Sequence, residues 1–423
     1  MTGRKLQKRG YDFFISYGHA DVERVRRVVS YLTKPCGLKV WFDAESGNAA
    51  QRSSELLGDA IGNARGAIFF ASAGWQQSTW CRNEYEMALA EQRAQDGYEI
   101  VSVRIDDSEP PAWFNVAEVV DLRTSDPAAT ARLLRSLASD VPHRFDNAQD
   151  VYLSAPWSRP TQSTRLAVAA LQATGWRLVG DSPDLPHFGQ SRVEAIMRTT
   201  RGVVAVLPYM PSEPLGTSRF ILEEAELARR KRLPLLLIVE AGVQLPPHLI
   251  DGAFQGTSVV VQGDSGAGPE LVAALDAFDD KLEGVHLSDT SAYIFLAGSL
   301  RDDEASSKDL STVIERASNM ACVRGERMLG NNIQEAIIDS VRRAMVVIAD
   351  VTDDHRNTLI EAGIALGSGT PVKLIAHTPD GILPKKRFMF EGQELHGYSS
   401  PEERLGICYW IARQYRRRIY VGR

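Results

Sequence analysis

A pattern that recurs three times along the chain constrains its fold more than any other feature. Each copy opens with a short apolar segment: "YDFFISYGHAD", "DVYLSAPWSR" and "SAYIFLAGSLRD". Each then continues through an amphipathic segment and a second apolar segment to a predicted helix with a glutamate near its start. The distance from an aromatic residue of the first apolar segment (Phe14, Tyr152 and Phe295) to this glutamate is 70, 72 and 66 residues (84 − 14, 224 − 152 and 361 − 295). This regular spacing indicates three copies of one structural unit.

Apolar strands alternate with amphipathic helices throughout the chain, and some strands, such as that in residues 233–239, are nearly continuous apolar runs. This alternation is typical of parallel sheets that helices cover on both faces. The sequence therefore predicts an α/β protein with three tandem Rossmann-like (flavodoxin-like), doubly wound parallel-sheet domains. We expect the boundaries in the polar segments "HRFDNAQD" and "GVHLSDTS", which gives domains at 1–145, 146–288 and 289–423.

The composition excludes several classes of function. A net charge of −6 argues against binding to duplex nucleic acid. The four cysteines are scattered without C-x-x-C spacing, so neither a disulfide framework nor a metal site is expected. No apolar run approaches the roughly 18 residues that a membrane span needs. We therefore expect a cytoplasmic protein without a membrane partner.

The three glutamates, Glu84, Glu224 and Glu361, share a predicted place in the fold. In open parallel sheets, ligands bind beyond the carboxyl ends of the strands, near the point where the strand order reverses. The glutamate-bearing helix of each copy begins just after such a strand end. On an arbitrary helix, a glutamate of this kind is an ordinary solvated side chain. Its shared placement instead predicts the rim of a ligand-binding cleft.

Residues 11–140 resemble a Toll/interleukin-1 receptor (TIR) domain. The segments "DFFISYGHAD" and "LKVWFDAES" are similar to the family's first two strands and the loop that follows the second strand. The segment "SAGWQQSTWCRNE" is similar to the family's S-x-W-C-x-x-E signature. The resemblance implies an NAD hydrolase of the bacterial TIR kind, with Glu84 as the catalytic glutamate. The loop "DAESGNAAQRSSELL" departs from the family because it lacks the usual proline and tryptophan.

A single carboxylate suits the implied reaction. Glycosidic cleavage usually takes two carboxylates, one of which protonates the leaving oxygen. In NAD the leaving group is already a cationic pyridinium and departs as neutral nicotinamide, so one anion near the ribose cation suffices. NAD would be the substrate, and no cofactor is expected. Around Glu84 we expect Tyr17 and Asp43 to line the cleft and Trp75 or Trp80 to form an aromatic wall.

The second half of the chain resembles two kinds of protein. Domain 3 is similar to nucleoside deoxyribosyltransferases, with Glu361 at the place of the nucleophile, and domain 2 is similar to a more diverged copy with Glu224 there. The order of a TIR domain and two Rossmann-like repeats resembles the TIR-SAVED effectors of bacterial cyclic-oligonucleotide-based antiphage (CBASS) defence. This second resemblance implies a SAVED sensor that binds a cyclic oligonucleotide, with a cyclic triadenylate as the expected activator, and a homo-oligomer or filament that forms on activation.

A cyclic oligonucleotide needs basic or polar groups for its phosphates and aromatic groups for its bases. The loops at the predicted strand ends supply such residues. They are Trp157, Arg159, Tyr209 and Arg219 in domain 2, and Ser299, Arg301, Arg356 and Asn357 in domain 3.

Three functional hypotheses therefore remain open. The first is a ligand-gated NAD glycohydrolase with its chemistry in domain 1. The second is a nucleoside or nucleotide N-glycosidase, or a deoxyribosyltransferase-like enzyme, in the C-terminal domain. The third is a non-catalytic TIR scaffold in which Glu84 is inert.

Overall fold

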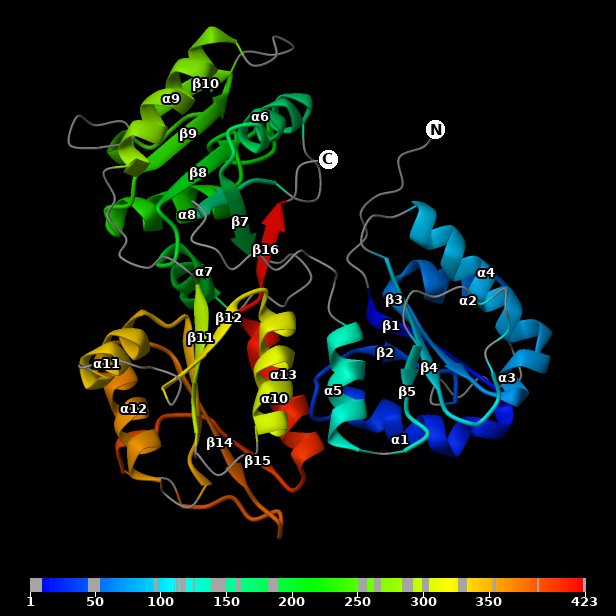
Figure 1. Ribbon diagram of the computed structural model, residues 1–423. Coiled ribbons are helices and arrows are strands. Elements are labelled where there is room, and N and C mark those ends of the chain that lie inside the picture. Colours follow the sequence, from blue (N-terminus) through cyan, green and yellow to red (C-terminus); the bar gives the residue numbers. More distant parts are fainter. Residues whose placement is uncertain are drawn as a thin grey trace. The chain divides into compact units, whose positions relative to one another are not determined.

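The computed structural model describes most of the chain. The described residues are 10–44, 54–94, 98–109, 111, 114, 119–124, 126–137, 150–156, 161–181, 189–249, 257–261, 268–283, 292–298, 304–325, 333–352, 355–385 and 388–420. Within them the strands form three sheets, and helices connect most of the successive strands along the chain (Figure 1). The predicted fold class is thereby confirmed.

The first sheet has the strand order β2-β1-β3-β4-β5 and is parallel throughout. Its strands are β1 (Tyr11–Tyr17), β2 (Val40–Trp41), β3 (Ala64–Ala71), β4 (Glu99–Arg104) and β5 (Val119–Asp121). The helices of this domain are η1 (His19–Asp21), α1 (Val22–Thr33), α2 (Ser54–Gly62), α3 (Ala73–Gln77), α4 (Thr79–Ala94) and α5 (Pro127–Ser136). This order is that of flavodoxin-like folds, and the strand order reverses between β1 and β3.

Strand β3 shows why the central strands read as apolar runs. All eight of its residues are buried, because helices cover both faces of the sheet. Gly66 in this strand has no room for a side chain, since a Cβ atom there would clash with the carbonyl oxygen of Glu99. The buried cation of the strand, Arg65, donates to the carbonyl of Leu137 at 3.0 Å and lies over the ring of Phe13.

The second sheet has the strand order β10-β9-β8-β6-β7-β16. Its strands are β6 (Asp150–Ser154), β7 (Arg177–Asp181), β8 (Gly202–Leu207), β9 (Leu235–Glu240), β10 (Thr257–Val261) and β16 (Arg417–Tyr420). The helices of this domain are α6 (Gln162–Gln172), α7 (Gly189–Met197), α8 (Arg219–Arg230), η2 (Pro247–Leu249) and α9 (Pro269–Glu283). Strands β6 to β10 pair in parallel and repeat the order of the first sheet.

Strand β16 comes from the far end of the sequence and pairs antiparallel with β7 (Figure 1). The guanidinium of Arg417 donates to Asp150 Oδ2 at 2.7 Å, and Arg177 donates to the other oxygen of the same carboxylate. Both Asp150 and Arg417 are 1% exposed. The side chain of Asn319 donates to the carbonyl of Arg417 at 3.1 Å. A buried cluster of one carboxylate and two guanidinium groups therefore fixes this strand at the edge of the second sheet.

The third sheet has the strand order β12-β11-β13-β14-β15, which again is that of the first. Its strands are β11 (Tyr293–Ala297), β12 (Ala321–Arg324), β13 (Val346–Asp350), β14 (Val372–His377) and β15 (Leu395–Tyr398). Its helices are α10 (Glu304–Ser318), α11 (Ile333–Arg343), α12 (Arg356–Gly367), η5 (Phe388–Phe390) and α13 (Pro401–Gln414).

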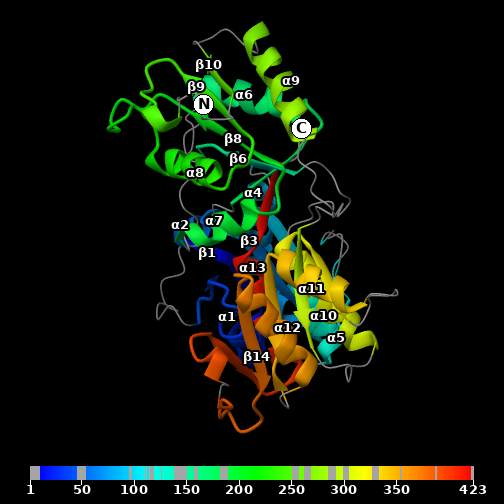
Figure 2. The same ribbon diagram turned by 90° about the vertical axis from the view of Figure 1, so that its left-hand side faces the viewer.

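The chain divides into two compact units. One combines residues 1–140 with most of the third domain, and the other combines residues 141–293 with 319–321 and 415–423. Within the first unit, α10 and α13 pack against α5, as both views show (Figures 1 and 2). There Arg413 forms an ion pair with Asp12, and the hydroxyl of Tyr31 donates to the carbonyl of Glu402 at 2.8 Å. Among the described helices, none has the length and apolar character to cross a membrane.

Candidate functional site at the strand ends of the first domain

The carboxylate of Glu84 lies at the carboxyl end of β1. Helix α4 carries it, and it is only 7% exposed. The hydroxyl of Ser16, the residue before the last of β1, donates to Glu84 Oε2 at 2.6 Å. Glu84 therefore sits at the point where the strand order of the first sheet reverses, which is where ligands of such sheets bind.

The ring of Trp75 lies in the core rather than on a surface. Trp75 is 1% exposed, and its ring packs against those of Phe69 and Phe114, with centroids 6.0 Å and 4.8 Å away. Its indole nitrogen Nε1 donates to Ser16 Oγ at 2.9 Å. The sequence suggested Trp75 as an aromatic wall for a substrate, but the structure connects it to Glu84 through Ser16.

Of the other predicted residues of this site, Tyr17 and Asp43 contact each other, whereas Trp80 is exposed. The hydroxyl of Tyr17, the last residue of β1, donates to Asp43 Oδ1 at 2.5 Å. The backbone carbonyl of Tyr17 accepts from the thiol of Cys81 at 3.4 Å, which ties the end of β1 to α4. Trp80, in the first turn of α4, is 42% exposed and presents its ring to solvent.

Sequence analysis missed Ser16. The available signal was its position, because a serine that stands one residue before the end of an otherwise apolar, buried strand needs a polar partner. What the sequence could not supply was the identity of that partner, which is 68 residues away along the chain.

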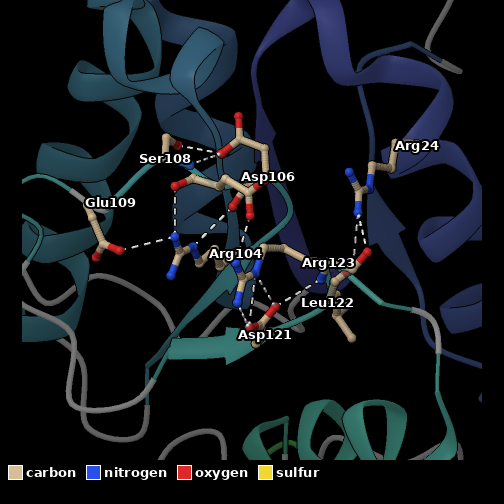
Figure 3. A network of polar contacts seen from close by, with 9 residues as sticks. Arg24, Arg104, Asp106, Ser108, Glu109, Asp121, Leu122 and Arg123 are labelled. Atoms are coloured by element: carbon tan, nitrogen blue, oxygen red, sulfur yellow. Dashed lines mark hydrogen bonds and ion pairs between the residues drawn. The ribbon is translucent and has the colours of Figure 1, made fainter.

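The loop after β4 lies at the same edge of the sheet and is held by a polar network (Figure 3). Arg104 donates to the backbone carbonyl of Asp107 at 2.8 Å, and Arg123 bonds Asp121 at 2.8 Å. Hydrogen bonds from the side chain and backbone of Arg123 lower the pKa of Asp121 to about 2. Asp106, in the middle of the network, accepts from the backbone N–H of Ala73 at 2.8 Å. The network therefore anchors the first residue of α3, the helix that carries Trp75.

The pKa of Asp106 reflects this anchoring role. Partial burial disfavours its charged form, but hydrogen bonds from the hydroxyl of Ser108 and from the backbone of Ala73 and Ser108 outweigh burial and lower the pKa. Asp106 is thus held as the carboxylate that the amide at the start of α3 requires.

The second sheet carries a related arrangement around Glu224. This residue lies on α8, and its Oε1 accepts from the hydroxyl of Tyr152 in β6 at 3.1 Å. Burial raises the pKa of Glu224 to about 7, and the nearby carboxylates of Asp181 and Glu223 add to the effect. The surroundings of this carboxyl group therefore favour its protonated form.

In the third sheet, Glu361 lies on α12, and its Oε1 is 2.9 Å from the position that a Cβ atom of Gly325 would take. A separate polar cluster occupies the carboxyl ends of β13 and β15. There Asp350 Oδ2 accepts from the hydroxyl of Tyr398 at 2.8 Å and from Arg404 at 2.9 Å. Burial, followed by the charge of Asp350, raises the pKa of Tyr398.

The predicted sensor residues fall into two groups. Four of them, Trp157, Arg159, Ser299 and Arg301, lie outside the described residues. The other four are exposed: Tyr209, Arg219, Arg356 and Asn357. The ring of Tyr209 packs over Gly216 and Gly242, both of which have positive φ angles. Arg219 donates to Glu223 at 2.7 Å in a surface ion pair.

Among the described residues, no group of three or more histidine, cysteine, aspartate and glutamate side chains is arranged to hold a metal ion. No disulfide joins the four cysteines in the same part of the chain.

The first sheet thus defines a flavodoxin-like α/β domain with a buried carboxylate at the point where its strand order reverses. Residues 13–134 match the protein family described as the TIR domain, which identifies an N-terminal TIR domain in this chain. A solved structure similar to the chain is the TIR domain of the Toll-related receptor TRR-2 from Hydra magnipapillata. The two are 21% identical, with a TM-score of 0.26, over 30% of this chain and 98% of that one. None of the curated proteins matches this sequence.

Proposed function

We propose that the N-terminal TIR domain hydrolyses NAD to nicotinamide and ADP-ribose, with Glu84 as the catalytic residue. The observation that carries this proposal is the hydrogen bond from Ser16 to Glu84 at 2.6 Å, which holds a buried carboxylate at the switch point of the sheet. A carboxylate fixed in this way can stabilise the positive charge that develops on the ribose as nicotinamide leaves. The leaving group needs no general acid, so a second carboxylate is not required.

The second and third domains form, in this proposal, a SAVED-like sensor for a cyclic oligonucleotide such as a cyclic triadenylate. Binding of this activator drives the chains into an oligomer or filament, as in a CBASS antiphage effector. A ligand that binds only the assembled form must favour assembly, because binding and assembly share one free-energy cycle. The low exposure of Glu84 in the single chain fits a site that opens only on assembly.

The test is nicotinamide release from NAD by the full-length protein with a panel of cyclic di-, tri- and tetranucleotides, with particle size followed by light scattering. We expect release that depends on one ligand and falls by at least a hundredfold in Glu84→Gln. The matched control is Glu86→Gln on the same helix, where Glu86 forms an exposed ion pair with Arg82. This control should retain wild-type release.

Two other outcomes would replace the proposal. Release that persists in Glu84→Gln and is lost in Glu361→Gln or Glu224→Gln would assign the chemistry to an N-glycosidase in the second half of the chain. The hydrogen bond between Tyr152 and Glu224 is the observation that favours this second candidate. No release with any ligand, together with ligand-dependent growth in particle size, would leave a TIR scaffold.

A further inference from the structure

Three buried side chains from three different elements form a continuous line of hydrogen bonds in the N-terminal domain. The indole N–H of Trp75 on α3 donates to Ser16 Oγ at 2.9 Å, and Ser16 Oγ donates to Glu84 Oε2 at 2.6 Å. Trp75 and Ser16 are each 1% exposed. We infer that Ser16 and Trp75 are positioning residues that orient the Glu84 carboxylate, an inference that rests on the function proposed above.

The direction of this line follows from counting hydrogen atoms. An indole nitrogen can only donate, and a serine hydroxyl has a single hydrogen together with two acceptor sites. Because Ser16 Oγ accepts the indole hydrogen of Trp75, its own hydrogen is directed at Glu84. The 2.6 Å separation lies in the range of charge-assisted bonds between a hydroxyl and a carboxylate. The line therefore favours Glu84 as an anion in one fixed orientation.

The anion needs such support because burial opposes it. Removing a carboxylate from water favours its protonated form, and a hydrogen bond to the charged form opposes this effect. Glu224 occupies the matching position in the second sheet. There the hydroxyls of Ser154 and Tyr152 lower the pKa of Glu224, with Tyr152 donating at 3.1 Å, but burial outweighs them and raises it to about 7. Hydroxyl groups near the end of the first strand of a copy therefore act on both glutamates in favour of the anion.

The backbone of the short helix that carries Trp75 is also held by hydrogen bonds. Its backbone N–H donates at 3.0 Å to Ser72 Oγ, and this hydroxyl donates to Asp21 Oδ2 at 2.5 Å. The N–H of Ala73 donates to Asp106, which the network in Figure 3 holds in place. The turn after β1 also lies against α3, since a Cβ atom on Gly18 would be 2.8 Å from the backbone nitrogen of Trp75. A rigid support of this kind is what a positioning group requires.

The test is a double-mutant cycle in the full-length protein with Ser16→Ala, Trp75→Phe and the double variant. Phenylalanine keeps most of the aromatic packing of Trp75 but has no N–H. We expect Ser16→Ala to lower kcat by about 10- to 100-fold, as for loss of a hydrogen bond to a charged group, with little change in KM. The acid limb of the pH–rate profile of Ser16→Ala should move to higher pH. Trp75→Phe should lower kcat less, and it should have no further effect in the Ser16→Ala background.

Two controls separate positioning from general damage to the sheet. Ser102→Ala removes a hydroxyl from β4, a strand of the same sheet, where Ser102 is fully buried and its Oγ has no hydrogen-bond partner among the described residues. Trp41→Phe changes a tryptophan of β2 whose ring stacks on Phe14. Neither variant should move the acid limb. A wild-type kcat and pH profile in Ser16→Ala, while Glu84→Gln is inactive, would overturn the inference and leave the proposed function intact.

A second measurement decides the matter even if the protein releases no nicotinamide. The indole ¹H–¹⁵N signal of Trp75 can be assigned in the full-length protein by its loss in Trp75→Phe. We expect this signal to shift in Ser16→Ala and to follow a titration at acidic pH that disappears in Glu84→Gln. A signal that is insensitive to both substitutions would show that the three side chains are not coupled.

Discussion

At the scale of single residues, three glutamates occupy the same place in three sheets but have different surroundings. Glu84 accepts from Ser16, and Glu361 lies over Gly325. Glu224 accepts from Tyr152, and the hydroxyl of Ser154 also lowers its pKa. The chemistry of a carboxylate depends on whether its partners favour the charged or the neutral form. The shared placement therefore does not give the three sites a shared chemistry.

Glu224 leads to a prediction about stability and pH. Burial raises the pKa of Glu224 from 4.5 to about 7 in the folded protein. Its contribution to stability is therefore fully present below pH 4.5 and is lost as the pH rises through 7, because the unfolded chain ionises first. The shift corresponds to about 3 kcal/mol of unfolding free energy. Glu224→Gln should abolish this loss of stability between pH 5 and pH 8.

The measurement is the free energy of opening of the second sheet, obtained from hydrogen exchange of the amides of β6 and β8 at pH 5 and pH 8. Glu270→Gln, at an exposed position in the first turn of α9, is the control and should keep the wild-type pH dependence. Equal pH dependence in Glu224→Gln and the wild-type protein would contradict the prediction.

At the scale of helices and strands, the short helix α3 matters more for the site than its five residues suggest. Its N-cap is Ser72, whose Oγ accepts the N–H of Trp75 and donates to Asp21. Ser72→Ala should cost about 1 kcal/mol of stability, as expected for loss of an N-cap. It should also lower nicotinamide release by displacing the indole of Trp75 from Ser16.

Thermal unfolding and steady-state kinetics test this prediction together. Ser136→Ala on α5 is the control, because the hydroxyl of Ser136 donates to the carbonyl of Arg132 on the same helix at an exposed site. It should change neither quantity. Loss of stability in Ser72→Ala without any loss of release would mean that α3 supports the fold but not the site.

The helices and strands also show how much of the fold and the site could be predicted from the sequence alone. Strands such as β3 and β9 were predictable, because parallel strands buried on both faces are apolar along their length. The position of Glu84 at a strand end followed from the order of the elements. The contacts of Ser16 with Trp75 and Glu84 did not, since they join positions 59 and 68 residues apart. The spacing of apolar residues specifies which face of a helix or strand is buried, but not which side chains pack against that face.

At the scale of the whole molecule, the C-terminal strand departs from the simple three-copy pattern. The repeats predict strands that pair within each copy, whereas β16 pairs with β7 across more than 200 residues of sequence, from Tyr420 to Leu178. The sequence "RRRIY" gave no sign of this, because three basic residues followed by two apolar ones do not specify a partner strand. The buried carboxylate of Asp150 specifies the pairing through Arg417.

This pairing gives a prediction for Arg417→Met. The substitution leaves Asp150 buried with Arg177 as its remaining guanidinium partner in the cluster, and breaking a buried ion pair costs about 3–5 kcal/mol. We expect a corresponding loss in the unfolding free energy of the second sheet, measured by hydrogen exchange of β6 and β7. Arg219→Met is the control, because its ion pair with Glu223 is exposed and worth about 0–1 kcal/mol. Similar effects of the two substitutions would show that the buried cluster contributes little.

The place of β16 has a practical consequence for work with fragments. A fragment cut at residues 146–288, as the repeat pattern suggests, would leave the backbone groups of β7 unpaired along its outer edge and would deprive Asp150 of one of its two cations. Open edges of this kind recruit strands from other molecules and cause aggregation. A soluble version of the isolated second domain should therefore carry residues 415–420 grafted onto it, and insolubility of the shorter fragment would say nothing about what that domain binds.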